Sequence, residues 1–205
     1  MPTSLMRDVE QWWRSTMHDD VVMSHDPSVL PPDLPVPTDD GACDHLAGAG
    51  LPDLELSSTS GASVNLSRLP GRSVVFCYPR TGRPGEDPPA GWDQIPGARG
   101  CTPESCGFRD SFPALQQLGV RVYGLSTQDT EYQRELVDRL HLPYEVLSDH
   151  ALRFTAAMRL PTFEAAGMTL IKRLTLVVED GKVARVFYPV FPPDRHAAEV
   201  VLALS

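Results

Sequence analysis

A regular alternation of strand-like and helix-like segments constrains the fold more than any other feature of this sequence. The alternation runs from about residue 53 to the end of the 205-residue chain. Short apolar stretches predict strands, and segments with apolar residues three or four positions apart predict amphipathic helices. Near the end, Asp180-Gly181 separates two β-rich stretches, and Asp-Gly favours a two-residue hairpin turn. This order predicts an α/β domain whose central mixed β-sheet is mostly buried and flanked by helices on both faces.

The individual elements are assigned by residue range. Strands are predicted at residues 53–56, 63–66, 73–78, 120–126, 144–147, 173–178 and 183–188. Helices are predicted after Cys101, at 130–141, near 149–158 and at 195–204. Thr130 and Gln133 have the spacing of a capping box, and Pro113 is expected to kink or open the helix after Cys101. The order of elements resembles that of a thioredoxin-like fold.

The first 47 residues differ in character from the rest of the chain. Residues 5–17 bring four apolar side chains near one helical face: Met6, Val9, Trp13 and Met17. They predict an N-terminal amphipathic helical extension, residues 1–25, that packs on the domain or recruits a partner. Five prolines between positions 27 and 37 disfavour a helix and predict a Pro-rich linker at 26–47. The compact domain is then expected to span 48–205.

Charge and hydrophobicity disfavour two classes of partner. The formal net charge of -9, with no local run of Lys and Arg, disfavours binding to nucleic acids and to anionic membrane surfaces. No stretch of 18 apolar residues is present, so no membrane-spanning helix is expected. Charged residues interrupt the first 25 positions, where a secretory signal would need an apolar core. We therefore expect a cytoplasmic protein.

Two of the four cysteines, Cys101 and Cys106, flank a segment with the composition of a helix start. Four cysteines are too few for a disulfide scaffold, so any disulfide is expected to serve redox chemistry. Thr102 is expected to cap the helix, Pro103 suits its first position, and Glu104 suits its first turn. Unpaired amide groups at a helix N-terminus favour a thiolate, so Cys101 is the expected nucleophile.

The spacing of the two cysteines has a mechanical consequence. In one regular helix their Cα atoms would lie about 8 to 9 Å apart, whereas a disulfide needs less than about 7 Å. Forming the disulfide is therefore expected to unwind the first helical turn. Two structural thiols are the alternative; a metal site is disfavoured because no second ligand pair follows. Cys77 is expected to be an inert core thiol, and Cys43 to be exposed in the linker.

Several segments together resemble the peroxiredoxins, and among them the bacterioferritin-comigratory or Q-type branch, over about residues 48–204. They are VVFCYPRTG, GCTPESCGFRD, GLSTQ, LSD, IKRLTLVVEDGK and VFYPV. The resemblance implies a peroxidatic Cys101, a resolving Cys106 and a supporting Glu104. It also implies that Arg173 stabilises the thiolate and the peroxide, which suits a side chain that stays charged; a surface position on a strand is the alternative. The resemblance implies neither a cofactor nor a metal.

One motif departs from the family pattern. The signature P-x-x-x-T-x-x-C, counted back from Cys101, has Gln94 and Ala98 where the family has proline and threonine. The earlier segment YPRTG supplies Pro79 and Thr81, followed by a Gly- and Pro-rich loop at residues 82–97. We expect the loop to fold back so that Pro79 and Thr81 serve the site. The loop then either shapes a substrate pocket or only packs.

These features predict a thiol peroxidase for hydrogen peroxide or organic hydroperoxides. The Cys101 thiolate is expected to become a sulfenic acid, which Cys106 converts to a disulfide. An external dithiol, such as a thioredoxin-like protein, would reduce that disulfide, and the enzyme is expected to be a monomer or homodimer. Two other hypotheses stay open: a scaffold adapted to thiol-disulfide exchange or a biosynthetic tailoring reaction, and a redox-sensing interaction module.

Overall fold

The computed structural model describes residues 26–205, so the predicted helix at 5–17 lies outside the described residues. The strands are β1 (Leu56–Ser58), β2 (Ser63–Val64), β3 (Arg72–Cys77), β4 (Arg121–Ser126), β5 (Glu145–Ser148), β6 (Thr162–Ala165), β7 (Met168–Ile171), β8 (Leu174–Glu179) and β9 (Lys182–Phe187). The α-helices are α2 (Cys101–Gln117), α3 (Thr130–Leu140), α4 (Arg153–Met158) and α5 (His196–Leu204). Short 3-10 helices lie at Leu66–Arg68 and Trp92–Gln94.

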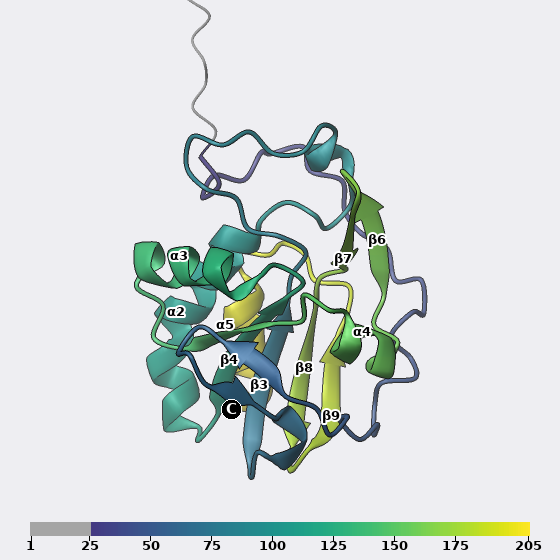
Figure 1. The fold of residues 1–205 in the computed structure, drawn as a ribbon, viewed down its shortest axis with the longest axis vertical. Helices are drawn as coiled ribbons and strands as arrows, with labels where there is room; N and C mark the ends of the chain where they lie inside the picture. Colours follow the sequence, from purple (N-terminus) through teal and green to yellow (C-terminus); the bar gives the residue numbers. More distant parts are fainter. Residues whose placement is uncertain (1–25) are drawn as a thin grey trace, which may run out of the picture.

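Seven of the strands form one mixed sheet in the order β2-β1-β5-β4-β3-β8-β9 (Figure 1). The central strands β3, β4 and β5 run parallel, whereas β8 runs antiparallel to β3 and β9 antiparallel to β8. Parallel neighbours need a crossover connection, which α2 supplies between β3 and β4 and α3 supplies between β4 and β5. The predicted central mixed sheet is confirmed.

Alternating side chains of β3 divide the core into two layers. Val74 and Phe76 pack in the layer that contains residues of α2, α3 and α5. Val75 and Cys77 point to the opposite face, where they pack in the layer that contains residues of α4. Successive residues of a strand face opposite sides of a sheet, so one buried strand feeds both layers. Helices therefore cover both faces, as predicted, and Cys77 is a core thiol.

The hairpin formed by β6 and β7 is missing from the elements predicted from sequence. Its two turn residues, Ala166 and Gly167, have φ values of 49° and 73°. Alanine is an unusual residue for this conformation, so Ala-Gly gives a weaker turn signal than Asp-Gly. The predicted turn at Asp180 and Gly181 is confirmed between β8 and β9, with φ values of 47° and 76°.

The start of α2 differs from the sequence prediction. Its N-cap is Gly100, which has a φ of 103°, so the prediction that Thr102 caps this helix is wrong. A Cβ atom at position 100 would lie 2.3 Å from the Cγ of Pro193, and the positive φ also favours glycine. Cys101 is therefore the first helical residue. The helix continues through Pro113 as one assigned segment.

The start of α3 also uses a cap other than the predicted one. The side chain of Asp129 accepts a hydrogen bond from the backbone N–H of Tyr132 at 2.7 Å, which makes Asp129 the N-cap. The predicted capping box of Thr130 and Gln133 is wrong, because the Gln133 amide donates instead to Ser126 Oγ at 3.0 Å. Asp129 precedes Tyr132, the first apolar residue of α3, by three residues. A cap at Asp129 therefore fits the sequence as well as the predicted cap at Thr130 does.

Part of the predicted linker belongs to the core. Cys43 is 6% exposed and Leu46 is fully buried, and both pack in the layer that contains Cys77. The prediction that Cys43 is exposed is therefore wrong, and burial raises the pKa of its thiol to about 12. We propose that the compact domain starts near residue 43 rather than 48. Among residues 26–205, no helix has the length and apolar character needed to cross a membrane.

Candidate active site

The Cys101 thiol, the Arg173 guanidinium and the Glu104 carboxylate form one buried cluster. Arg173 Nη2 lies 3.2 Å from Cys101 Sγ, and its Nη1 pairs with a carboxylate oxygen of Glu104. The three residues are 1%, 3% and 0% exposed, respectively. Cys101 and Glu104 are one turn apart on α2, and Arg173 directly precedes β8. The structure brings these three predicted residues together, and the alternative of a surface position for Arg173 is wrong.

Backbone carbonyls before α2 hold Arg173 in place. Its Nη2 donates to Ala98 O at 3.3 Å and to Arg99 O at 3.1 Å. The Cys101 thiol itself donates to Ala98 O at 3.5 Å. Ala98 is fully buried, so its carbonyl is sequestered from solvent and satisfied by these two donors. The backbone at Ala98 thus orients both the arginine and the thiol.

Burial and charge act in opposite directions on the thiol. Burial raises the pKa of Cys101, the Arg173 charge lowers it, and a charged Glu104 raises it. Burial is the largest of these effects, so the pKa of the thiol lies above its ordinary value in the reduced protein. Burial likewise raises the pKa of Glu104, and Arg173 opposes that shift. The site therefore holds one cation between two acids that both resist ionisation.

Cys106 lies on the same helix as Cys101, and both thiols are free. Because α2 is helical from Cys101 onward, their Cα atoms are separated by about 8 to 9 Å, too far for a disulfide. Cys101 is buried, whereas Cys106 is partly exposed. Burial raises the pKa of Cys106 and the neighbouring Arg109 lowers it.

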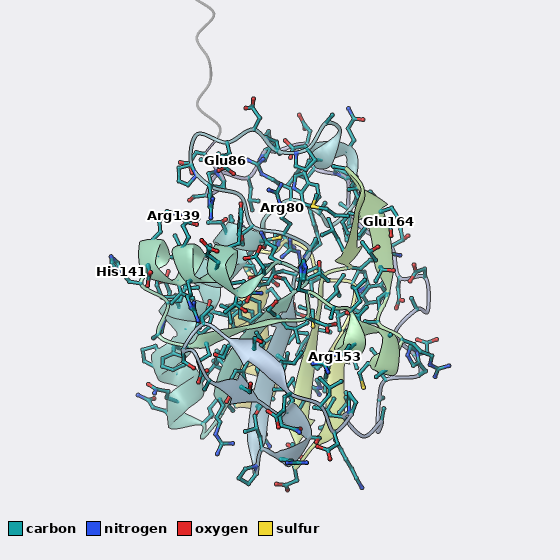
Figure 2. The ribbon with its side chains drawn as sticks, viewed as in Figure 1. Arg80, Glu86, Arg139, His141, Arg153 and Glu164 are labelled. Atoms are coloured by element: carbon teal, nitrogen blue, oxygen red, sulfur yellow. The ribbon has the colours of Figure 1, made fainter. Side chains whose placement is uncertain are left out.

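A cavity of about 30 Å³ lies against Cys101. Loop 82–97 forms much of its wall, through Pro88, Pro89 and Trp92, and Arg80 lines it from the end of β3. Figure 2 labels Arg80 and Glu86 at the end of the molecule where the loop covers the sheet. One buried water needs roughly 10 to 15 Å³, so the cavity has room for about two water-sized groups. The predicted loop therefore shapes a small pocket.

Thr81 lines this cavity, but its polar atoms are engaged elsewhere. Its backbone N–H and its hydroxyl donate to Gln128 Oε1 at 2.9 and 3.1 Å, and its carbonyl accepts from Gln128 Nε2 and from the Tyr132 hydroxyl. Pro79 is buried two residues beyond β3 and is not among the residues that line the cavity. The structure thus brings Thr81 to the cavity wall as predicted, whereas Pro79 does not line the cavity.

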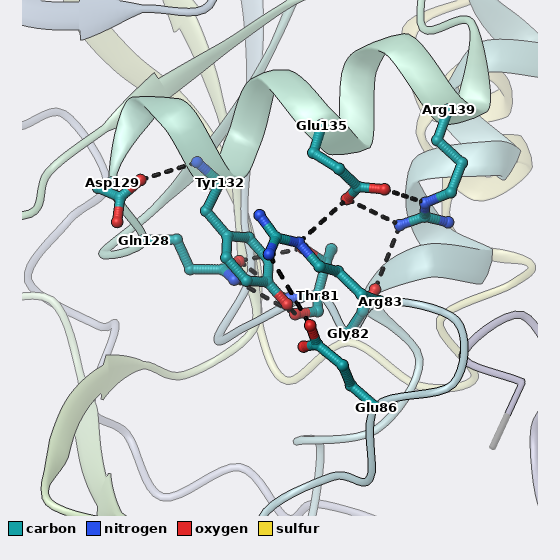
Figure 3. Close-up of polar contacts among 9 residues, drawn as sticks. All are labelled: Thr81, Gly82, Arg83, Glu86, Gln128, Asp129, Tyr132, Glu135 and Arg139. Atoms are coloured by element: carbon teal, nitrogen blue, oxygen red, sulfur yellow. Dashed lines mark hydrogen bonds and ion pairs between the residues drawn. The ribbon is translucent and has the colours of Figure 1, made fainter.

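Loop 82–97 is fixed to α3 by charged side chains (Figure 3). Arg139 donates to Glu135 at 2.6 Å and to the carbonyl of Gly82 at 3.2 Å. Arg83 lies 3.8 Å from Glu135 and stacks over the ring of Tyr132, 4.3 Å from its centroid. Exposed ion pairs contribute little singly, but this network shares Glu135 between two arginines and adds a cation–π contact. The start of the loop is therefore anchored beside Thr81.

The segment 26–40 runs beside loop 82–97 at the end of the molecule opposite the C-terminus (Figure 1). Arg99 is 8% exposed and donates to the carbonyl oxygens of Asp26 and Val29 at 3.2 and 3.0 Å. Pro27, between them, lines the cavity beside Cys101. At the other end of the segment, Asp40 pairs with Lys172 at 2.7 Å. The segment acts as a strap that is held at both ends and contributes Pro27 to the cavity wall.

Comparisons with known proteins agree with this site. The sequence profile of the redoxin family matches residues 46–202, and the chain therefore belongs to that family. A curated relative, "Peroxiredoxin Q, chloroplastic" of Oryza sativa subsp. japonica, is 30% identical over 160 residues, which are 77% of this chain and 66% of the relative. "Peroxiredoxin bcp1" of Schizosaccharomyces pombe is 31% identical over 127 residues, 60% of this chain and 57% of the relative. The chain thus spans less than two thirds of the length of each of these relatives.

Solved structures give the same placement. "Peroxidoxin BcpB from Mycobacterium tuberculosis" has a TM-score of 0.61 and 27% identity, over 77% of this chain and 95% of that chain. A Xylella fastidiosa PrxQ mutant has a TM-score of 0.62 at 18% identity over 77% of this chain and 94% of that chain, which shows the shared fold. The predicted resemblance to the Q-type peroxiredoxin branch and the thioredoxin-like fold are confirmed.

Three residues of the site were not singled out from the sequence. Arg99 holds the strap, Gln128 holds Thr81, and Tyr144 donates its hydroxyl to the carbonyl of Ser105 on α2 at 2.7 Å. Gln128 lies in GLSTQ, a segment that already carried the family resemblance, so it had a signal. Arg99 and Tyr144 act through contacts distant in sequence, which no local pattern reveals.

Proposed function

We propose that the protein is a thiol-dependent peroxidase that reduces hydrogen peroxide in preference to bulky organic hydroperoxides. The observation that carries the proposal is the contact of Arg173 at 3.2 Å with Cys101 Sγ, a residue that itself lines a cavity of about 30 Å³. Hydrogen peroxide has two heavy atoms and fits the space of about two waters, whereas an organic hydroperoxide needs the loop or the strap to move. Membership of the redoxin family and the peroxiredoxin relatives support the same activity.

The first step is nucleophilic attack by the Cys101 thiolate. The sulfur bonds to one peroxide oxygen, the O–O bond breaks, and the second oxygen leaves as hydroxide and is protonated to water. Sulfur is oxidised to a sulfenic acid and the peroxide is reduced. Arg173 favours the thiolate by Coulomb attraction, and Glu104 holds the guanidinium beside the sulfur.

The second step joins Cys101 to Cys106. The Cys106 thiolate attacks the sulfenic sulfur, a disulfide forms and hydroxide leaves, to be protonated to water. Because the two residues share one helix, α2 must unwind at its start before the sulfur atoms can meet. An external dithiol, such as a thioredoxin-like protein, then returns both thiols to the reduced state.

The test mixes reduced protein with hydrogen peroxide in a stopped-flow instrument and follows consumption of the thiol. The wild type and Cys106→Ser are expected to show the same fast first phase, and Cys101→Ser is expected to lose it. Mass spectrometry after one equivalent of peroxide is expected to find a Cys101–Cys106 disulfide in the wild type and a sulfenic acid in Cys106→Ser. Cys77→Ser, at a core position away from the cavity, is the matched cysteine control. A fast phase that survives in Cys101→Ser would refute the assignment.

The partners and the location stay proposals from the sequence. We retain a monomer or homodimer and a cytoplasmic location, while the rice relative is named as chloroplastic. The hypothesis of a tailoring or exchange enzyme rests on Ala98 and on loop 82–97. The hypothesis of a redox-sensing module rests on unwinding of the helix after Cys101 and on the helix predicted at 5–17, which lies outside the described residues. No specific contact of the described residues favours them, because the cavity under that loop is small and contains the Cys101 thiol as its nucleophile.

A further inference from the structure

A buried hydroxyl without a partner in the described part of the chain belongs to a residue at the wall of the cavity beside Cys101. Thr102 follows Cys101 on α2, is 2% exposed and lines the cavity. Its Oγ1 has no hydrogen-bond partner within residues 26–205. Buried polar groups in native proteins are nearly always paired, and one left unpaired often marks a functional position. A molecule in the cavity would supply the missing partner.

The other groups around the cavity do not offer a free hydroxyl donor to a molecule bound there. The hydroxyl of Thr81 donates to Gln128 Oε1 at 3.1 Å, so its proton is committed to holding the loop. Ala98 stands where the family signature has threonine, and its side chain carries no donor. Arg173 contacts the sulfur of Cys101 but does not line this cavity. Among the described hydroxyl groups at the cavity, Thr102 alone is uncommitted.

We infer that the Thr102 hydroxyl binds the peroxide in the cavity and donates a hydrogen bond to the oxygen that leaves when Cys101 attacks. The inference rests on the proposed peroxidase function and names a substrate-binding residue for it. As the S–O bond forms and the O–O bond breaks, negative charge builds on the leaving oxygen, which departs as hydroxide and takes a proton to become water. A fixed donor beside that oxygen stabilises the transition state more than the ground state.

Under this inference, Arg173 and Thr102 stabilise negative charge on two different atoms. Arg173, held by Glu104 and by the carbonyls of Ala98 and Arg99, stabilises the negative charge on sulfur before the attack. Thr102, from the cavity side, stabilises the charge on the departing oxygen. Its backbone position as the second residue of α2 is fixed by the helix, so we expect the buried hydroxyl to reach the substrate by rotation of the side chain alone.

The test compares two reactions of Cys101 in three variants. Thr102→Val removes the hydroxyl at nearly constant volume, Thr102→Ser restores it, and Thr162→Val is a matched control at an exposed site on β6. Stopped-flow kinetics give the rate constant for oxidation by hydrogen peroxide. Alkylation by iodoacetamide gives the reactivity of the thiolate toward a reagent that needs no such donor. Loss of one donor to a developing charge is expected to slow peroxide oxidation about tenfold to a hundredfold in Thr102→Val.

The expected pattern is a slow peroxide reaction in Thr102→Val, unchanged alkylation, and recovery to within about threefold in Thr102→Ser. If Thr102→Val slows both reactions equally, the residue acts through the thiolate and the inference is overturned. If Thr102→Val oxidises as fast as the wild type, the inference fails while the peroxidase function stands. If the wild type itself reacts no faster than a free thiol, the proposed function fails and the inference fails with it.

Discussion

The buried His196 makes the stability of the fold depend on pH. The side chain is 1% exposed, lies between the rings of Phe108 and Phe187, and has its Nε2 2.8 Å from Thr175 Oγ1. Burial, with a smaller contribution from the Arg173 charge, lowers the pKa of His196 to about 3. An unfolded histidine titrates near 6.5, so between these two values the unfolded chain binds a proton that the folded protein does not.

The sign and the size of the effect follow from this difference. Because the unfolded state is the one that gains a proton, the free energy of unfolding falls as pH decreases through 6.5 and stops falling near the folded pKa. At pH 5 the solution is about 1.5 pH units below the pKa of the unfolded histidine. The free energy of unfolding is therefore about 2 kcal/mol lower at pH 5 than at pH 8. By pH 3, where the folded histidine is itself about half protonated, the loss reaches about 4 kcal/mol, close to the whole stability of a marginal domain.

The assay is urea unfolding at pH 8 and at pH 5 for the wild type and for His196→Gln, which cannot take up this proton. The quantity of interest is the difference between the two proteins in their loss of free energy, since the other titrating groups cancel. We expect the wild type to lose about 2 kcal/mol more than the variant. His150→Gln, at an exposed position, controls for removal of a histidine. Equal losses in the wild type and His196→Gln would show that the buried imidazole is not the source.

Three further predictions concern the active site. Glu104→Gln keeps a partner for Arg173 but removes the charge that raises the pKa of Cys101, so the pH profile of Cys101 alkylation is expected to shift to lower pH; an unchanged or upward shift contradicts this. One equivalent of hydrogen peroxide is expected to increase amide exchange at residues 101–106 in the wild type and not in Cys106→Ser; equal protection before and after disulfide formation would exclude unwinding. Arg99→Ala is expected to release the strap and raise the rate with cumene hydroperoxide several-fold relative to hydrogen peroxide; an unchanged ratio of the two rate constants contradicts the strap as a barrier.

Local patterns were sufficient to predict the sheet and the crossover helices, whereas the role of Arg173 beside Cys101 followed only from the family resemblance. Strand periodicity and turn residues are local, and the cysteine spacing belongs to one helix. What the sequence did not reveal depends on contacts between distant segments. Thr102 has the chemistry of an N-cap, yet Pro193 packs against position 100, where only glycine at a positive φ fits. The N-cap is therefore Gly100 rather than Thr102, and Thr102 lies at the cavity wall with no partner for its hydroxyl among the described residues.

The charge balance of the buried cluster links the two acids to each other. Arg173 supplies one permanent positive charge. Because an unpaired buried charge is costly, the cluster favours about one negative charge beside it. Glu104 and Cys101 compete for that charge, since burial raises the pKa of both and Arg173 lowers both. A protonated Glu104 therefore favours the Cys101 thiolate, and the uncharged sulfenic acid that follows returns the negative charge to Glu104. In the proposed reaction the carboxyl proton is released when hydroxide leaves, so we expect the pair to titrate as a unit and the pH dependence of peroxide reduction to belong to both groups.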